Sequence, residues 1–263
     1  MVVRAVSLLA CLAVLAACSP VAGATERMVR VPSADGDRTS LVHVPGSAGD
    51  GAPLVIVLHG SGGSGAEAES DFGWDALADE EGFVVAYPDG LNGTWNGGAC
   101  CGTARRRGVD DIGFLEALTQ RLATENRIDP HRVYAVGFSN GGILAYAWAC
   151  SRPGDLAGIG PVAGAVLVPC TAPAPMKVVA VHGTADDRVP FAGGRAAGGA
   201  QYPGVDGSLA PFLAADGCSD PPAVDGEVST WRCRTGGVVR HVIDGGGHAW
   251  PDGTAEFLWP HLN

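Results

Sequence analysis

Residues 132–149 read RVYAVGFSNGGILAYAWA and contain two short apolar runs joined by a glycine-rich turn. The first run, 133–137, has the length of a buried strand, and the second, 143–149, is predicted to be a helix. Small residues at such a strand-to-helix junction permit a strained turn that lifts a serine hydroxyl above the sheet. The turn holds the chain's single Gly-x-Ser-x-Gly pattern, Gly137 to Gly141, and Ser139 is therefore our candidate nucleophile.

Other short apolar runs alternate with predicted helices along the chain. Continuous apolar strands are typical of parallel sheets that are covered on both faces. The predicted strands are 54–58, 83–87, 133–137, 178–181 and 238–243. Helices are predicted at 67–80 and 109–124, and residues 28–31 and 38–44 are expected to form an antiparallel hairpin around Asp35-Gly36. This order predicts an α/β fold with a mostly parallel, doubly wound sheet.

A serine hydroxyl becomes an effective nucleophile when a base removes its proton. Among seven histidines, His248 is the best candidate because it lies in a glycine-rich loop after a predicted strand. The orienting carboxylate is expected after a late strand and before that histidine, and Asp186 meets both conditions. We expect its neighbour Asp187 to face solvent or Arg188. The chain order serine, aspartate, histidine is that of the α/β-hydrolases.

Backbone amides are needed to stabilise the oxyanion of an acyl-transfer reaction. The segment 58–63, LHGSGG, follows the first strong core strand, and its glycines let amide groups face a developing charge. We expect the amides of Ser61 and Asn140 to form this oxyanion hole. The loop lacks the lysine-containing and Gly-x-Gly-x-x-Gly patterns of nucleotide-binding loops. His59 and His182, which end apolar strands, are expected to be structural.

Residues 1–24 are predicted to be an export signal. Arg4 precedes an apolar stretch, 5–17, that is too short to span a bilayer as a helix. Residues 15–18, LAAC, resemble a lipoprotein signal in which Cys18 is lipidated, whereas residues 22–24, AGA, fit ordinary signal peptidase. We favour lipidation, with residues 25–263 forming a single catalytic domain at the cell surface or outside the cell.

Six cysteines follow this segment, and an oxidising compartment favours disulfides. Proximity in sequence favours the pair Cys218 and Cys233 and the pair Cys150 and Cys170. For Cys100 and Cys101 a vicinal bridge and a different pairing scheme both remain open. No Cys-x-x-Cys spacing or Cys/His cluster of the usual kind occurs, so we predict no metal.

The overall charge restricts the partners of the chain. Acidic residues outnumber basic ones by 28 to 17, which gives a formal net charge of -11. Such a surface repels phosphate backbones, so we expect no nucleic acid partner. We expect a monomer that contacts the membrane only through a lipid anchor.

Six motifs, taken together and in order, resemble the polyhydroxybutyrate depolymerase and feruloyl esterase family of exported bacterial esterases. They are LHG at 58–60, WNGG at 95–98 with CCG at 100–102, VDDIGF at 109–114, GFSNGG at 137–142, HGTAD at 182–186 and GGHAWP at 246–251. The resemblance implies an α/β-hydrolase fold, hydrolysis of carboxylic esters without a metal or organic cofactor, and a triad at Ser139, Asp186 and His248.

The substrate is predicted from the motifs and the loops around them. The segment 164–176 leaves no room for a helical lid, so the site should be open to bulky or polymeric groups. Trp95 and Trp250 lie beside motif residues and are candidates for the cleft wall, with a buried structural role as the alternative for each. Feruloyl or acetyl esters and short hydroxyalkanoate oligomers are the expected substrates. The alternatives are a catalytically silent surface lipoprotein and a peptidase or acyltransferase with the same triad.

Overall fold

A ten-stranded sheet forms the centre of the protein, seen in a computed structural model that describes residues 23–196 and 200–263. The predictions for the export signal and for Cys18 lie outside these residues. The strands follow the order β1-β2-β4-β3-β5-β6-β7-β12-β11-β10. From β4 to β12 in this order every neighbouring pair is parallel, while the pairs at both ends are antiparallel. The predicted α/β-hydrolase type of sheet, with its N-terminal hairpin, is confirmed.

The strand bounds agree with the buried apolar runs. The parallel strands are β4 (Val84–Pro88), β3 (Leu54–Leu58), β5 (Val133–Phe138), β6 (Gly158–Val162), β7 (Lys177–Gly183) and β12 (Gly237–Ile243). The N-terminal hairpin is β1 (Thr25–Val31) and β2 (Arg38–Val44), and the opposite edge is β11 (Val228–Arg232) and β10 (Ser219–Asp225). A separate two-stranded antiparallel sheet consists of β8 (Gly194–Arg195) and β9 (Gln201–Tyr202).

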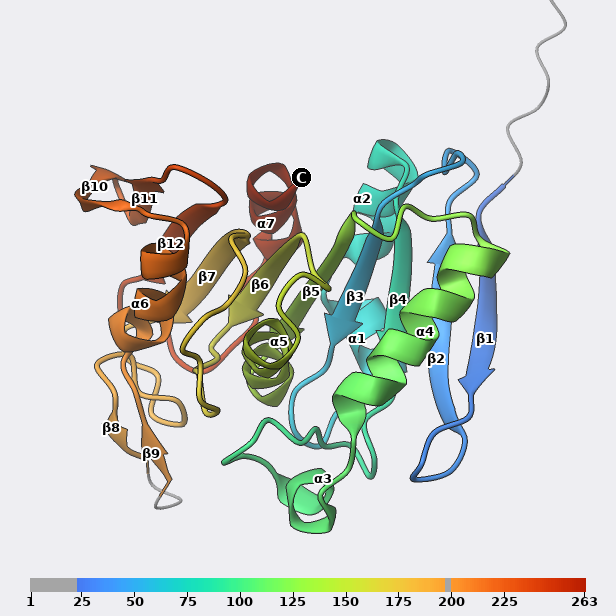
Figure 1. Cartoon of the computed structure of the whole chain (residues 1–263), viewed down its shortest axis with the longest axis horizontal. Coiled ribbons are helices and arrows are strands. Elements are labelled where there is room, and N and C mark those ends of the chain that lie inside the picture. Colours follow the sequence, from blue (N-terminus) through green and yellow to red (C-terminus); the bar gives the residue numbers. More distant parts are fainter. Residues whose placement is uncertain (1–22, 197–199) are drawn as a thin grey trace, which may run out of the picture.

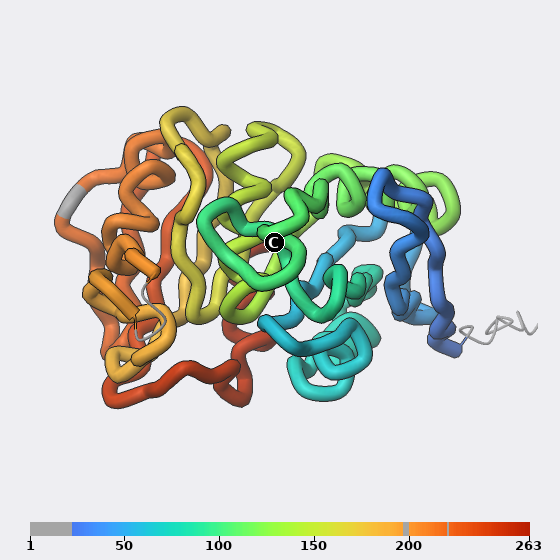
Figure 2. Tube along the Cα trace, turned by 90° about the horizontal axis from the view of Figure 1, so that it is seen from below, coloured from blue at the N-terminus to red at the C-terminus, as the bar shows by residue number. Residues whose placement is uncertain are grey.

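Helices cover both faces of the sheet. Figure 1 shows α4 (Asp111–Glu125), α5 (Asn140–Ser151) and α6 (Val205–Ala215) in front, with α1 (Gly65–Asp71), α2 (Trp74–Glu81) and α7 (Thr254–Leu262) behind. Each helical layer packs on its face of the sheet through its own apolar cluster. Figure 2 views the edge at which the parallel strands end and the short helix α3 (Gly102–Arg107) lies. The functional loops are expected at this edge.

Two predicted helices have different bounds in the structure. The helix expected at 67–80 is two helices, because Gly73 adopts a left-handed conformation with φ of 78° and separates α1 from α2. The helix expected at 109–124 begins at Asp111, since the Asp110 carboxylate caps it by accepting the Gly113 amide at 3.0 Å. Strand β6 was not predicted. Its sequence GIGPV contains glycine and proline, which are less common in strands than in other structures.

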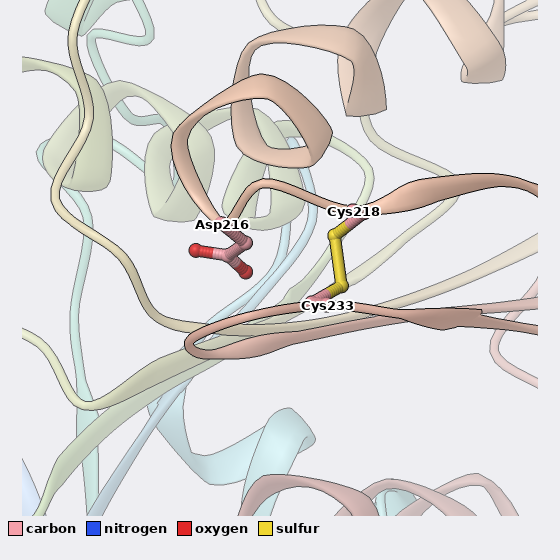
Figure 3. Close-up of side chains that lie close together, drawn as sticks. All are labelled: Asp216, Cys218 and Cys233. Carbon is pink, nitrogen blue, oxygen red and sulfur yellow. A yellow bond between two sulfur atoms is a disulfide. The ribbon is translucent and has the colours of Figure 1, made fainter.

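The described residues contain three disulfides. Cys150 is bonded to Cys170 and Cys218 to Cys233, which are the two expected pairs. The remaining cysteines form the vicinal bridge Cys100–Cys101, the first of the two alternatives. In Figure 3 the bond between Cys218 and Cys233 joins the end of α6 to the end of β11, with Asp216 beside it.

The Asp216 carboxylate has a structural role beside this bond. It accepts the backbone amides of Met176 at 3.1 Å and Gly237 at 3.0 Å. Burial raises its pKa, although these two hydrogen bonds oppose the shift. The two sulfur atoms nearby are bonded to each other, so they are not thiolate ligands for a metal.

No lid helix lies between β6 and β7, because residues 163–176 are irregular throughout. The predicted absence of a helical lid in this segment is confirmed. In the described ranges, 23–196 and 200–263, we find no helix of the length and apolar character needed to cross a bilayer.

Candidate active site

Ser139 lies at the sharp turn between β5 and α5. Its backbone has φ of 54° and ψ of -115°, a strained conformation for a residue with a side chain. Two glycines permit the turn: a Cβ at Gly137 would lie 2.6 Å from the Gly141 carbonyl carbon, and one at Gly141 would overlap the Leu58 carbonyl. The turn is held in place by the Ser139 amide, which donates to the Val162 carbonyl at 2.8 Å. The hydroxyl is therefore presented at the carboxyl edge of the sheet.

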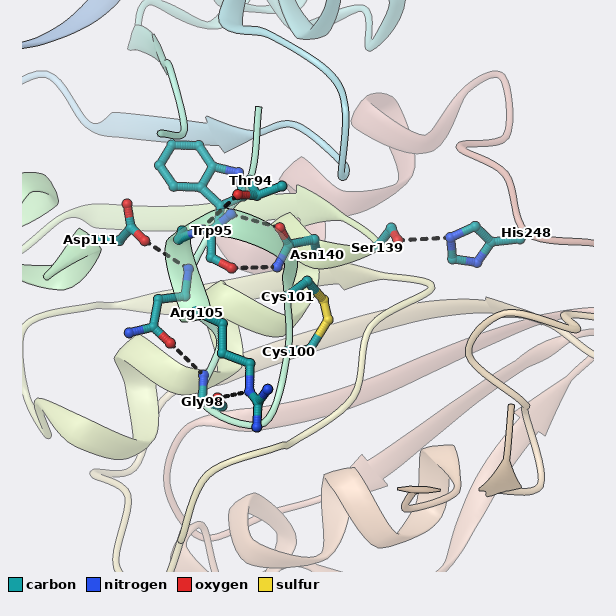
Figure 4. The surroundings of a disulfide bond; sticks show 12 residues. Thr94, Trp95, Gly98, Cys100, Cys101, Arg105, Asp111, Ser139, Asn140 and His248 are labelled. Carbon is teal, nitrogen blue, oxygen red and sulfur yellow. Dashed lines mark hydrogen bonds between the residues drawn. A yellow bond between two sulfur atoms is a disulfide. The ribbon is translucent and has the colours of Figure 1, made fainter. Parts of the chain in front are cut away.

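Three side chains from different loops form a continuous hydrogen-bonded chain. His248 Nε2 lies 2.8 Å from Ser139 Oγ, and His248 Nδ1 lies 2.8 Å from Asp186 Oδ2. Because Nδ1 faces a carboxylate, it carries the ring proton, and Nε2 accepts the serine hydroxyl. The structure thus brings together the three residues that the sequence analysis selected. Figure 4 shows the Ser139 to His248 contact.

The Asp186 carboxylate is held by donors on both oxygens. Oδ1 accepts the backbone amides of Arg188 at 2.9 Å and Val189 at 2.8 Å, while Oδ2 faces His248 and lies 3.3 Å from His182 Nε2. Burial alone would raise the pKa of Asp186, but hydrogen bonds from His182, His248 and Val189 hold it well below its usual range. Asp187 is exposed to solvent, as expected. The site therefore keeps Asp186 ionised and fixed in orientation.

His182 contacts the carboxylate of Asp186. The sequence analysis assigned His182 only a structural role. Its side chain is buried, and Nε2 contacts the Val189 carbonyl at 2.8 Å as well as Asp186. His182 thus joins both ends of the turn 186–189. Its place at the end of β7, four residues before Asp186, was the available signal, but sequence alone does not show that the ring turns toward the carboxylate.

The expected oxyanion loop packs against the serine turn. A Cβ added at Gly60 would lie 2.9 Å from the Phe138 ring and 3.6 Å from Ser139 Cβ. Within the described part of the chain, the Ser61 amide donates to no backbone carbonyl. Asn140 is the first residue of α5, where helix amides lack intrahelical partners. Both amides therefore remain candidates for the oxyanion hole.

Comparison with known proteins identifies the family. Residues 38–211 match the family described as Esterase PHB depolymerase. The chain belongs to this family. The chain is 34% identical to the putative esterase NocK of Nocardia uniformis subsp. tsuyamanensis over 90% of its own length and 78% of that protein.

Other relatives are longer than the aligned region. The chain is 29% identical to feruloyl esterase B of Piromyces equi, aligning 82% of its own length but 43% of that protein. It thus spans less than half of this relative. Among solved structures, acetyl xylan esterase from Aspergillus awamori superposes with a TM-score of 0.66 at 15% identity, covering 89% of this chain and 98% of the other. That likeness supports the α/β-hydrolase fold.

Trp95 of the esterase lies beneath the site and not on its surface. Its side chain is 0% exposed, and its indole nitrogen donates to the His59 carbonyl at 3.0 Å. The Asn140 side chain clamps its backbone: Asn140 Oδ1 accepts the Trp95 amide at 2.7 Å and Asn140 Nδ2 donates to the Trp95 carbonyl at 2.9 Å (Figure 4). Of the two alternatives for Trp95, the structure favours the buried one. The Asn140 side chain thereby fixes the loop that carries Cys100 and Cys101.

His59 supports the expected oxyanion loop, which agrees with its expected structural role. Its Nδ1 donates to the Gly60 carbonyl at 2.7 Å, and its Nε2 accepts the Gly90 amide at 2.9 Å. Burial lowers the pKa of His59, although the hydrogen bond to Gly60 opposes the shift. These two contacts require one protonated and one unprotonated ring nitrogen, which is the arrangement in a neutral imidazole.

A buried ion pair holds the same loop from behind. Arg38 Nη2 lies 2.8 Å from Asp111 Oδ1, and Asp111 Oδ2 accepts the Asn96 amide at 2.7 Å. Burial raises the pKa of Asp111, while the contacts to Asn96 and Arg38 lower it. Loss of either partner would leave an uncompensated buried charge, so this pair is expected to be needed for the loop's conformation.

An aromatic wall borders His248. Trp250 stacks on Phe72 with ring centroids 4.2 Å apart and planes inclined by 11°. Phe138 continues this wall, 6.3 Å from Phe72 and 4.9 Å from His248 between ring centroids. Phe72 and Phe138 also line a pocket of about 300 Å³ together with residues 59–63. Trp250, predicted to line the cleft, is thus part of the wall beside this pocket.

Proposed function

We propose that the protein is an exported serine carboxylic ester hydrolase that works through an acyl-enzyme. The observation that carries the proposal is the chain from Asp186 through His248 to Ser139, with 2.8 Å at both hydrogen bonds. A binding protein has no need for a serine held in a strained turn and hydrogen-bonded to an oriented histidine. The family membership of the chain supports the same chemistry.

The acylation step follows from this geometry. His248 Nε2 accepts the hydroxyl proton while Ser139 Oγ attacks the ester carbonyl carbon. The carbonyl oxygen becomes an oxyanion, which the amides of Ser61 and Asn140 stabilise. Asp186 stabilises the imidazolium, and His248 then returns the proton to the departing alcohol oxygen. The products of this half-reaction are a Ser139 ester and a free alcohol.

Deacylation repeats these roles with water as the nucleophile. His248 Nε2 takes a proton from water, the resulting hydroxide attacks the Ser139 ester, and the oxyanion again forms at the same amides. The proton returns to Ser139 Oγ as the carboxylic acid leaves. No cofactor enters either half-reaction as proposed.

Feruloyl or acetyl esters and short hydroxyalkanoate oligomers are the proposed substrates. The Phe72, Trp250 and Phe138 wall offers flat apolar contact to an aromatic acyl group. The exposed carboxylates of Glu67 and Asp71 also line the pocket, which favours neutral, hydroxyl-bearing substrates over anionic ones. Relatives named acetylxylan esterase/xylanase, feruloyl esterase and poly(3-hydroxyalkanoate) depolymerase support these classes.

A substrate panel tests the proposal. Methyl ferulate, para-nitrophenyl acetate and hydroxybutyrate trimer are incubated with the purified protein and with Ser139→Ala, and acid release is measured. We expect turnover by the native protein alone, with methyl ferulate preferred to esters whose acyl group carries a free carboxylate. A phosphonate probe should label Ser139, identified by peptide mass spectrometry. Absence of both turnover and labelling would favour the silent binding protein instead.

The same panel separates the rival triad enzymes. A peptidase would cleave peptide anilides faster than the matched esters, and an acyltransferase would pass the acyl group to an added alcohol in preference to water. We propose hydrolysis, because the site has no helical lid between β6 and β7 to exclude water. We also propose export, a lipid anchor at Cys18 and a monomeric state, as the leader sequence and surface charge indicate.

A further inference from the structure

Three acidic side chains surround one buried histidine where β1, β2 and α2 meet. His43 of β2 is the direct register partner of Glu26 in β1. Asp75 and Asp79 lie one helical turn apart on α2 and both face His43. Within the described part of the chain, none of these three carboxylates forms a salt bridge with arginine or lysine. The histidine is thus the single basic group that they share.

The two ring nitrogens of His43 have different surroundings. The side chain is 4% exposed, and Nε2 lies 3.0 Å from Asp79 Oδ1, to which it donates its proton. Nδ1 is buried and has no hydrogen-bond partner in the described structure. It faces Asp75 Oδ2 at 3.8 Å and Glu26 Oε1 at 3.9 Å, distances too long for hydrogen bonds. His43 Nδ1 is thus a buried ring nitrogen that has no hydrogen bond and lies close to two carboxylate oxygens.

The surrounding contacts resemble the outer shell of a metal site. Tyr87 in β4 donates its hydroxyl to Asp75 Oδ1 at 2.6 Å, which leaves Oδ2 turned toward the histidine. Metal-binding histidines commonly donate their second nitrogen to a carboxylate, as His43 does to Asp79, and metal-binding carboxylates are themselves hydrogen-bonded. One ligand atom each from Glu26, His43 and Asp75 lies within 4.8 Å of the others. Two ligands that are each about 2 Å from one ion lie at most about 4 Å apart, so the exposed side chain of Glu26 has to move closer when an ion binds.

We propose that Glu26, His43 and Asp75 form a binding site for a divalent transition-metal ion of the Zn²⁺ class. One imidazole nitrogen with two carboxylates suits such an ion better than Mg²⁺ or Ca²⁺, which prefer oxygen ligands alone. Water completes the coordination on the exposed side, where Glu26 is 67% exposed. Asp79 and Tyr87 act as positioning residues.

The proposed ion joins the N-terminal hairpin to α2 and has no part in the ester chemistry. Glu26, His43 and Asp75 come from three elements, so their spacing in sequence has no metal-binding pattern. The sequence analysis predicted no metal because it found no Cys-x-x-Cys spacing and no Cys/His cluster. Those patterns do not include a site made of one histidine and two carboxylates. Failure of this inference would leave the esterase proposal unchanged.

Zn²⁺ binding by the purified protein, freed of any affinity tag, tests the inference. Isothermal titration calorimetry is expected to show one Zn²⁺ per chain, and Mg²⁺ is expected to bind at least tenfold more weakly. At a Zn²⁺ concentration of a hundred times the dissociation constant, the melting temperature should rise by about 5 °C or more. Glu26→Gln should weaken Zn²⁺ binding at least tenfold, and its exposed position makes misfolding an unlikely explanation.

Two further variants complete the design. Asp79→Ala keeps all three ligands but removes the hydrogen bond to Nε2, and it should weaken binding about tenfold or more. The control is Glu227→Gln, because Glu227 Oε2 lies 3.7 Å from His241 Nε2 in an exposed pair outside the cluster. The control should bind Zn²⁺ as the native protein does. The inference would be overturned if Zn²⁺ showed no saturable binding, or if Glu26→Gln bound Zn²⁺ as tightly as the native protein. The cluster would then be an imidazolium of His43 paired with carboxylates.

Discussion

Replacing Asp186 with asparagine should remove the base function of His248 while keeping the size and shape of the side chain. The Oδ1 atom of Asp186 accepts hydrogen bonds from the amides of Arg188 and Val189. The one side-chain oxygen of the asparagine must therefore occupy this position. An NH₂ group at that position would face two other donors. The asparagine NH₂ is therefore turned toward His248 Nδ1 and donates to it. The ring proton then moves to Nε2, where it faces Ser139 Oγ and blocks proton transfer.

The expected loss follows from this change of tautomer. In a serine protease the equivalent substitution lowers turnover by about 10⁴. We expect kcat for para-nitrophenyl acetate to fall by roughly three to four orders of magnitude, or about 4–5.5 kcal/mol of transition-state stabilisation. Substrate affinity should change little, because the pocket is untouched. Nitrogen NMR of the His248 ring should show the proton on Nδ1 in the native protein and on Nε2 in the variant.

Asp187→Asn is the matched control for this prediction. Asp187 is the next residue, carries the same charge and is exposed, so its substitution should lower kcat less than about tenfold. Circular dichroism and melting curves would establish that both variants are folded. A loss below tenfold in folded Asp186→Asn, or a larger loss in Asp187→Asn, would refute the assignment of the orienting role.

Three further outcomes are expected. Ser139→Ala should abolish ester hydrolysis while leaving the melting curve intact, and retention of most of the activity would contradict the acyl-enzyme. Cys18→Ala should move the protein from the membrane fraction to the soluble fraction of its host, unless native protein is already soluble with Thr25 at its N-terminus. Because hydrogen bonds depress the folded-state pKa of Asp186, its ionised form stabilises the fold above about pH 4, and this contribution is lost as the pH falls below that value. The urea midpoint should therefore decrease more between pH 6 and pH 3 in the native protein than in Asp186→Asn.

Local patterns in the sequence were enough to predict most of the parallel strands and to select the three residues that form the hydrogen-bonded chain. Buried parallel strands must be apolar on both faces, so β3, β5 and β7 are recognisable without any knowledge of their partners. The glycines around Ser139 are required by the backbone turn itself, and that requirement is local. The same reasoning failed at β6, whose glycines and proline are tolerated only because its neighbours bury it on both sides.

Contacts between distant residues were decided by the tertiary structure alone. Sequence selected Ser139 and His248 separately, but only folding brings their side chains together across 109 positions. The Asn140 clamp on Trp95, 45 positions away, made that tryptophan part of the support beneath the site. The absence of a hydrogen bond at His43 Nδ1 likewise depends on how α2 packs against the hairpin in the described structure. Sequence determines which residues can perform such chemistry, whereas the direction of each side chain depends on packing between elements that no local pattern encodes.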